Sequence, residues 1–250
     1  MPDLFSILSG VEGLEWIIAA CFLSGIVRGF AGFGTAMIFL PVVTRFVDPV
    51  AAITTLALMD IVGPLPNVPG AWRAADKPDL RRLCTGMVLA MPVGLFILQF
   101  IAPESFRLAV SLLSLAMLAV LISGMKYRGP VTPALTTTVG AVGGFMGGLA
   151  GLPGPPVILF YMARPLAAVS IRAVNMLYLL IYDLVLIAVL AVFGRLALEA
   201  VVLGLVLVGP GLLGNMLGGR LCIPGYERMY RWAAYGIIAV SALSGLPIWG

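Results

Sequence analysis

Three charged residues lie inside long apolar stretches of this 250-residue chain, where charges are rare. Arg28 precedes a glycine-rich run, Asp60 lies midway along residues 50–71, and Asp183 lies midway along residues 173–193. A charge at the centre of a membrane helix costs about 2.5–3.5 kcal/mol on insertion scales, so each one needs a partner or an aqueous cavity. A buried guanidinium suits an anionic ligand, and a buried carboxylate suits proton uptake or an ion pair with a cation.

The elements that must position these charges are apolar segments of membrane-spanning length. The chain is 61% hydrophobic and only 10% charged, whereas soluble domains carry roughly 25% charged residues. Its apolar segments cover approximately residues 14–46, 50–71, 83–102, 108–125, 133–163, 173–193, 199–219 and 232–249. We interpret the short polar stretches at 73–82, 126–130 and 220–231 as loops. The pattern predicts an all-α membrane protein that crosses the bilayer several times.

Two of the apolar segments are interrupted by glycine and proline. The first is broken at Arg28–Gly34 and the fifth at Gly143–Pro156, and neither sequence can continue a regular helix. Irregular backbone at membrane depth is tolerated only where protein or a water-filled cavity covers it. The flanks of the first break are short: residues 14–27 span about 21 Å as a helix and residues 35–46 about 18 Å, against a hydrocarbon core of about 30 Å.

Each broken segment is therefore either one kinked span or a hairpin that enters the membrane and leaves on the same side. Kinked spans place equal numbers of basic residues on the two sides. Hairpins leave three on one side, namely Arg45, Arg107 and Arg195. They place eleven on the other side: Arg73, Lys77, Arg81, Arg82, Lys126, Arg128, Arg164, Arg172, Arg220, Arg228 and Arg231. Because basic loops stay in the cytoplasm, this bias favours hairpins with both termini outside.

The two broken segments resemble each other, which indicates an internal repeat. Residues 29–32 match residues 144–147, and each break is followed by three apolar segments. We predict two halves, 1–126 and 127–250, within a single membrane domain. One hairpin and three crossings make an odd number of passes, so the second half is inverted, as in many transporters. The alternative is a shared glycine packing motif without a repeat.

We predict that an anionic substrate binds at the tips of the hairpins, where helix N-termini and glycine backbone are available. The predicted substrate-binding residues are Arg28, Gly29, Gly32, Gly34, Gly147, Gly151, Gly154, Arg172 and Asn175. Asp60 and Asp183 lie at related positions in the two halves and are predicted to couple a proton or to form ion pairs. Further donors at membrane depth are Asn67, Gln99, Tyr178, Tyr182 and Asn215. For Arg28 the alternative is a buried ion pair or snorkelling, and for the two aspartates it is hydrogen bonding or neutralisation of Arg28 or Arg172. For the other polar residues it is hydrogen bonding between helices without substrate contact.

Several classes of chemistry find no support in the sequence. The chain has no histidine, no P-loop motif and no basic run with interleaved aromatics, so we expect no cofactor, no metal and no nucleic-acid partner. Cys21, Cys84 and Cys222 are too far apart for a metal motif and indicate no disulfide framework. The acidic N-terminal stretch lacks the basic region of a cleavable signal peptide.

The chain resembles the TauE/SafE family of anion exporters, also called the sulfite exporter family. The resemblance rests on Val27-Arg-Gly-Phe-Ala-Gly-Phe-Gly-Thr-Ala-Met-Ile-Phe-Leu-Pro41, on the second glycine- and proline-rich run Gly143–Pro156, and on the layout of segments. It implies export of sulfite, sulfonates or related small anions across the bacterial inner membrane. Thr35 and Ala36 stand where several family members have glycine, so the substrate need not be sulfite.

Together these observations predict a secondary transporter, not an enzyme, that exports small anions by alternating access. Its expected partners are the small anion and the lipid bilayer, and the arrangement is compatible with a homodimer. An anion channel is the alternative within transport. An intramembrane enzyme, such as a lipid-phosphate phosphatase, is the alternative outside it, although the hairpin tips hold no Glu, His or Asp. A membrane scaffold without transport activity is disfavoured by the buried charges.

Overall fold

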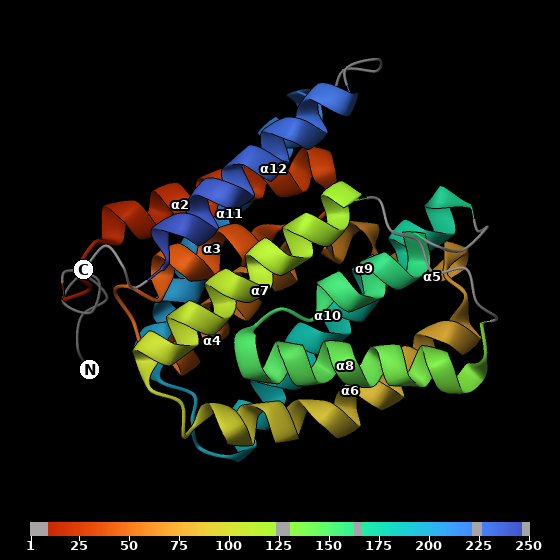
Figure 1. Cartoon of the computed structure of the whole chain (residues 1–250), viewed down its shortest axis with the longest axis horizontal. Coiled ribbons are helices and arrows are strands. Elements are labelled where there is room, and N and C mark those ends of the chain that lie inside the picture. Colours follow the sequence, from red (N-terminus) through yellow and green to blue (C-terminus); the bar gives the residue numbers. More distant parts are fainter. Residues whose placement is uncertain (1–9, 124–130, 163–166, 222–226, 247–250) are drawn as a thin grey trace.

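A computed structural model describes residues 10–123, 131–162, 167–221 and 227–246, and within these ranges the chain is helical without strands (Figure 1). The elements are α2 (Leu14–Ala31), α3 (Thr35–Val43), α4 (Pro49–Val62), the 3₁₀ turn η1 (Leu65–Asn67), α5 (Val68–Ala74), α6 (Lys77–Leu98), α7 (Pro103–Ser123), α8 (Pro133–Ala150), α9 (Gly154–Met162), α10 (Ala168–Val192), α11 (Leu198–Leu221) and α12 (Glu227–Ser244).

Four of these helices are long and apolar enough to cross a membrane. They are Lys77–Leu98, Pro103–Ser123, Val169–Val192 and Leu198–Leu221. A fifth span results if Pro49–Val62 and Leu65–Ala74, which are bent by 46° relative to each other, are taken together. This confirms the prediction of a multi-pass membrane protein. The bend was not predicted, and it falls where Pro64 and Pro66 remove backbone donors.

Polar caps fix the start of three helices. Asp48 accepts hydrogen bonds from the backbone N–H groups of Val50 and Ala51, Asp76 accepts from that of Asp79, and the Thr132 hydroxyl accepts from that of Leu135. Each cap is followed by a proline in the first turn, where proline is tolerated. The cap at position 76 corrects the interpretation of residues 73–82 as a loop, because α6 already begins at Lys77.

The chain reverses direction at the first break, as the hairpin interpretation predicts. Gly32 and Gly34 adopt φ angles of 77° and 101°, a conformation that only glycine adopts readily. Gly34 then lies beside the Val27 side chain, and Phe46, just beyond α3, lies against Gly13 at the start of α2. Helix α3 therefore runs antiparallel to α2 and packs on it.

The second break also reverses the chain, but it is shorter than predicted. Residues 143–150 are the regular end of α8, and the irregular backbone is confined to residues 151–153, with Gly151 at φ 68°. The carbonyl of Pro153 returns to lie beside Gly143. The prediction that the α8 glycines belong to the break was therefore wrong. A helix buried against other helices tolerates glycine at the points where the helices approach closely.

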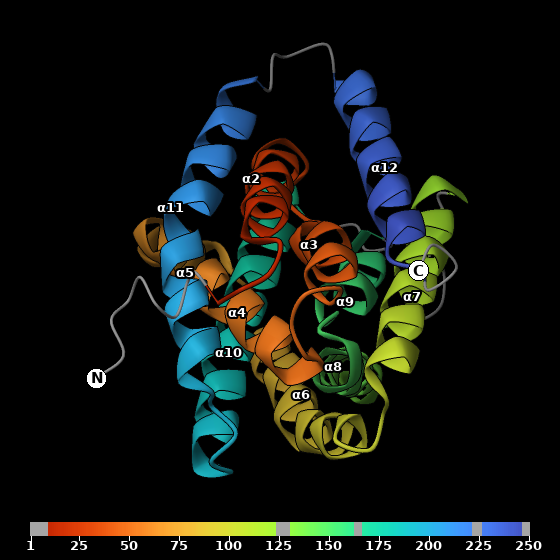
Figure 2. The same cartoon turned by 90° about the vertical axis from the view of Figure 1, so that its left-hand side faces the viewer.

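Glycine also sets the two closest helix pairs, α2 with α11 and α6 with α8 (Figure 2). A Cβ atom added to Gly29 would meet the carbonyl oxygen of Asn215, and one added to Gly218 would meet the carbonyl oxygen of Ile26. A Cβ added to Gly144 would lie 2.5 Å from the carbonyl oxygen of Met87. These small residues let the backbones touch, as membrane helices require for tight packing.

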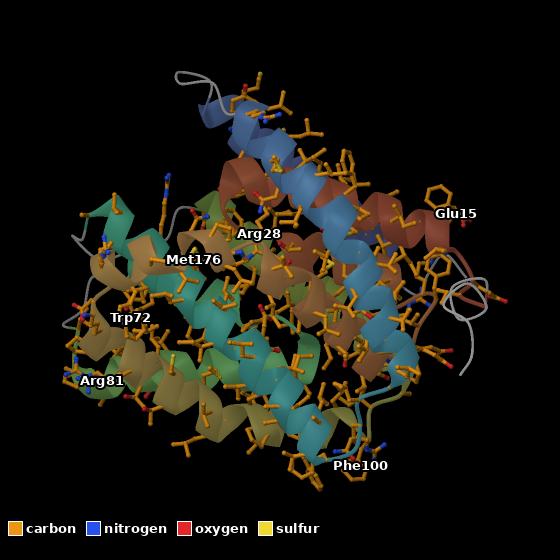
Figure 3. All side chains as sticks on the ribbon, turned by 180° about the vertical axis from the view of Figure 1, so that it is seen from behind. Glu15, Arg28, Trp72, Arg81, Phe100 and Met176 are labelled. Carbon is orange, nitrogen blue, oxygen red and sulfur yellow. The ribbon has the colours of Figure 1, made fainter. Side chains whose placement is uncertain are left out.

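The bundle has two polar ends, which we name after exposed aromatic residues (Figure 3). The Phe100 end carries the α6–α7 and α10–α11 junctions, joined by a hydrogen bond of 2.8 Å from Arg195 Nη2 to Gln99 Oε1. The Trp72 end carries the α5–α6 junction and the end of α9, joined by a hydrogen bond of 3.5 Å from the Tyr161 hydroxyl to Asp79 Oδ2. Arg28 lies between the two ends.

Candidate functional site

The two breaks line a common cavity of about 70 Å³ at the centre of the bundle. Its walls combine Arg28 and residues 32–37 from the first break, residues 151–155 with Ile158 and Leu159 from the second break, Leu56 and Asp60 of α4, Met117 and Leu121 of α7, and Leu179, Tyr182 and Asp183 of α10. A water molecule needs about 10–15 Å³ of such cavity volume, counted as the space open to the centre of a water-sized sphere. The cavity therefore has room for several waters or for one small anion.

Arg28 and Asp60 form an ion pair in the wall of this cavity. Nη1 of Arg28 lies 2.6 Å from Oδ1 of Asp60, and their side chains are 17% and 19% exposed. Such a short contact between charged groups is a strong, charge-assisted hydrogen bond. The sequence indicated that Arg28 needs a partner, and the structure identifies Asp60 from the neighbouring helix α4.

Asp183 lies on the same cavity without a partner of its own. It is 8% exposed, and no hydrogen bond or ion pair joins it to any other described residue. It is close enough to Arg28 and Asp60 to interact with both charges. The charged lining thus consists of one guanidinium and two carboxylates, which gives a net charge of −1 when all three groups are ionised.

Two helix N-termini also reach the cavity. Helix α3 starts at Thr35 after Gly34, which offers no side chain to cap it, and α9 starts at Gly154. Both starts line the cavity. The free N–H groups of the first turn of α3 and the positive ends of both helix dipoles favour an anion there. Pro155 and Pro156 have no backbone N–H, so α9 offers fewer donors than α3. The glycines next to them let a ligand approach the backbone closely.

The structure brings seven of the predicted site residues together: Arg28, Gly32, Gly34, Asp60, Gly151, Gly154 and Asp183 line the cavity. The other four lie elsewhere. Gly29 packs on the backbone of α11, and Gly147 packs on the ring of Tyr182. Arg172 is exposed in the first turns of α10. Asn175 is partly buried, and its Oδ1 has no hydrogen-bond partner.

Tyr182 belongs to the cavity although the predicted site omitted it. It is 3% exposed, and its hydroxyl is buried with no hydrogen-bond partner among the described residues. The sequence marked it only as a donor at membrane depth. In the sequence, the one sign of a role at the site was its position next to Asp183. That its side chain lies at the cavity, with its ring against Gly147, is visible only in the structure.

A second, smaller cavity of about 20 Å³ adjoins the same ion pair. It is lined by Cys21, Gly25, Met59, Gly63, Gly211, Leu212 and Asn215, and it shares Arg28, Thr35 and Asp60 with the first cavity. The Arg28–Asp60 pair therefore forms part of the wall between two cavities. Among the described residues, no group of three His, Cys, Asp or Glu side chains could hold a metal ion.

These features define a multi-pass membrane protein with a cavity between two broken helical segments, whose mostly apolar lining carries three charged side chains. The chain belongs to the sulfite exporter TauE/SafE family, whose model matches residues 17–245. It is also similar to a curated protein of Cupriavidus necator strain H16 named "Probable sulfite/organosulfonate exporter TauE". The two are 24% identical over 223 residues, which cover 86% of this chain and 87% of the relative. No solved structure matches the chain.

Proposed function

We propose that this protein is a secondary transporter that exports sulfite, an organosulfonate or a similar small anion. The observation that carries the proposal is the shared cavity, where Arg28 and the N-termini of α3 and α9 converge. These groups supply positive charge and N–H donors to an anion. The name of the C. necator relative describes an exporter, which favours transport over the enzymatic alternative.

Proton coupling follows from the charge of the cavity. With Asp60 and Asp183 both ionised, an anion would meet a net charge of −1 and an arginine that is already paired. Protonation of Asp183 or Asp60 removes this repulsion, and protonation of Asp60 also frees the Arg28 guanidinium for the anion. The anion and at least one proton are therefore expected to occupy the site together.

Alternating access between the two sides fits the position of the ion pair. Because Arg28 and Asp60 line both cavities, a change of partner by Arg28 changes the wall between them. In this proposal the ion pair closes the anion site in the empty state, and the anion replaces Asp60 as the partner of Arg28.

We extend the proposal to the whole chain as two inverted repeats, residues 1–126 and 127–250. In this arrangement α2 corresponds to α8, and α6 corresponds to α11. The two closest helix pairs, α2 with α11 and α8 with α6, are then equivalent. In both pairs, glycines contact the backbone of the partner helix. This is what two copies of one structural repeat would produce.

The proposed orientation places the Trp72 end in the cytoplasm of a bacterial inner-membrane protein. Described basic residues on that side are Arg73, Lys77, Arg81, Arg82, Arg172 and Arg220, against Arg45, Arg107 and Arg195 on the Phe100 side. Arg228 and Arg231, also in the prediction, belong to the first turns of α12, and Lys126, Arg128 and Arg164 lie outside the described residues. By the positive-inside rule both termini are then outside the cell.

A thermal-shift screen of the purified protein tests the proposed substrate class. Sodium salts of sulfite, thiosulfate, methanesulfonate and acetate are compared with sodium chloride at equal ionic strength. A ligand that binds only the folded protein raises its melting temperature, so we expect sulfite or a sulfonate to stabilise the protein more than chloride does. The proposal is wrong if no oxyanion of this panel exceeds chloride.

A further inference from the structure

The inner face of α7 carries three polar groups that are buried without a hydrogen-bond partner in the part of the chain that the structure describes. They are Nε of Arg107 and the hydroxyls of Ser111 and Ser114. Both serines are completely buried. The spacing of four and three residues puts all three side chains on one face of the helix. Leaving buried polar groups unpaired is unfavourable, and native proteins rarely do so without a reason.

Other buried hydroxyls of this protein do find partners. The hydroxyls of Thr44 and Thr54 each donate to the carbonyl four residues earlier at 2.7 Å, and that of Ser24 donates to Cys21 at 2.8 Å. A serine in a helix can satisfy itself in this way without help from a neighbour. Ser111 and Ser114 do not, so their hydroxyls remain available for a ligand.

Ser111 lies at the contact of α7 with α3 and α12, which both pack on α7, and Arg107 and Ser114 lie on the same face of the helix. A Cβ added to Gly245, just after α12, would lie 2.7 Å from the Ser111 hydroxyl oxygen and 2.9 Å from the Pro41 carbonyl oxygen. Pro41 interrupts the hydrogen bonding of α3, which makes that helix easier to bend. We call Arg107, Ser111 and Ser114, with Pro41 and Gly245, the α7 seam.

The polar stripe of α7 leads toward the central cavity. Two and three turns beyond Ser111 on the same face, Met117 and Leu121 line that cavity. Arg107, at the other end of the stripe, lies in the second turn of α7 on the side of the Phe100 end. From Arg107 to Leu121 the helix rises about 21 Å, which is the distance that the stripe covers between that end and the cavity.

We propose that the α7 seam is the closed exit path of the anion toward the Phe100 end. When α7 separates from α3 and α12, Ser111, Ser114 and Arg107 become successive binding positions for a small oxyanion. Hydroxyl and guanidinium groups donate hydrogen bonds to such an anion. The one acidic residue of α7, Glu104, is exposed at the start of the helix. The inference rests on the proposed anion transport.

Cysteine accessibility in proteoliposomes tests the path. Ser111→Cys and Ser114→Cys are introduced into a chain whose three natural cysteines are replaced by alanine, and each is treated with a charged, membrane-impermeant thiol reagent. Leu112→Cys is the matched control, because the Leu112 side chain is 52% exposed on the opposite, lipid-facing side of α7. We expect positions 111 and 114 to react and position 112 to remain unmodified.

Sulfite added during labelling separates the path from the proposed function. If the path and the function are both correct, sulfite changes the labelling rate at positions 111 and 114 several-fold. If positions 111 and 114 are labelled but the rate does not respond to sulfite or any sulfonate, the path is supported and the proposed substrate is contradicted. If positions 111 and 114 are as unreactive as position 112 in vesicles that still transport sulfite, the proposed path is wrong. The proposed function is then unaffected.

Replacing the hydroxyls distinguishes a transport role from a structural one. The double variant Ser111→Ala/Ser114→Ala removes two unpaired polar groups, so its melting temperature should equal or exceed that of the parent protein. Its anion flux should fall at least several-fold, because two donors of the path are lost. Unchanged flux would contradict the inference, and so would a lowered melting temperature with flux reduced only in proportion to the folded protein.

Discussion

Arg28 is the residue on which the site depends. Its guanidinium lies between the two ends of the bundle and pairs with Asp60 at 2.6 Å. The sequence predicted that a charge at this depth requires a partner, because an isolated one is costly. Which of the two candidate aspartates serves as the partner depends on how α4 and α10 are placed relative to Arg28, and no sequence pattern determines that placement.

Arg28→Ala should abolish anion binding and also destabilise the protein by about 3–5 kcal/mol, since it leaves a buried carboxylate unpaired. The double variant Arg28→Ala/Asp60→Asn removes both charges and should recover most of the lost melting temperature. It should still show no stabilisation by sulfite. Thermal melts of the three proteins with and without sulfite check this, and sulfite stabilisation that persists in the double variant would exclude Arg28 from the site.

Asp183→Asn should uncouple transport from the proton gradient. The side chain lies on the cavity without a partner among the described residues, so the exchange removes a titrating group without breaking an ion pair. Sulfite exchange should persist, while uptake driven by an imposed pH gradient disappears. Asp48→Asn is the control, because Asn also caps a helix; if it loses the response equally, Asp183 has no specific role.

Tyr182→Phe should weaken anion binding without lowering stability. The hydroxyl it removes has no partner, and loss of one ligand hydrogen bond is worth about 0.5–1.5 kcal/mol, or up to about tenfold in affinity. Tyr178→Phe is the matched control, since the Tyr178 hydroxyl approaches the Gly140 carbonyl at 3.5 Å and lies outside the cavity. Equal effects of the two variants on sulfite affinity would argue against contact between Tyr182 and the anion.

At the scale of elements, the sequence predicted both chain reversals but not their extent. Gly32, Gly34 and Gly151 adopt positive φ angles, and a glycine cluster interrupted by proline is a strong signal for such a turn. In the sequence, however, glycines at helix contacts cannot be distinguished from glycines in a turn. Gly144 and Gly148 of α8 contact the backbone of α6, and only the tertiary structure separates these glycines from those of the break.

The glycine contacts between α6 and α8 predict a large effect for a small change. Gly144→Ala should destabilise the protein by about 1–3 kcal/mol, because the new methyl group overlaps the backbone of Met87 and backbone atoms cannot move aside cheaply. Gly209→Ala in α11 is the control, since nothing lies within 4 Å of its Cβ position. Melting temperatures measured in the same detergent check this, and equal values for both variants would contradict the assigned packing.

At the scale of the whole molecule, charge bias predicts which end faces the cytoplasm. Phe100 and Trp72 are 75% and 50% exposed at opposite ends of the bundle. In intact cells, Phe100→Cys should react with an impermeant thiol reagent, and Trp72→Cys should react only after the membrane is permeabilised. The reverse pattern would invert the proposed orientation. The sequence alone could give this prediction, because the charge of each loop follows from its residues. Side-chain packing does not follow from the sequence in this direct way.

We propose that the cavity between the two breaks carries a small anion across the membrane. The most direct test is the flux of radiolabelled sulfite into proteoliposomes that contain either the wild-type chain or the folded double variant Arg28→Ala/Asp60→Asn. We predict saturable flux for the wild type and no flux above protein-free liposomes for the variant. Equal flux through both proteins would contradict the claim, because the anion would then cross without the cavity's cation.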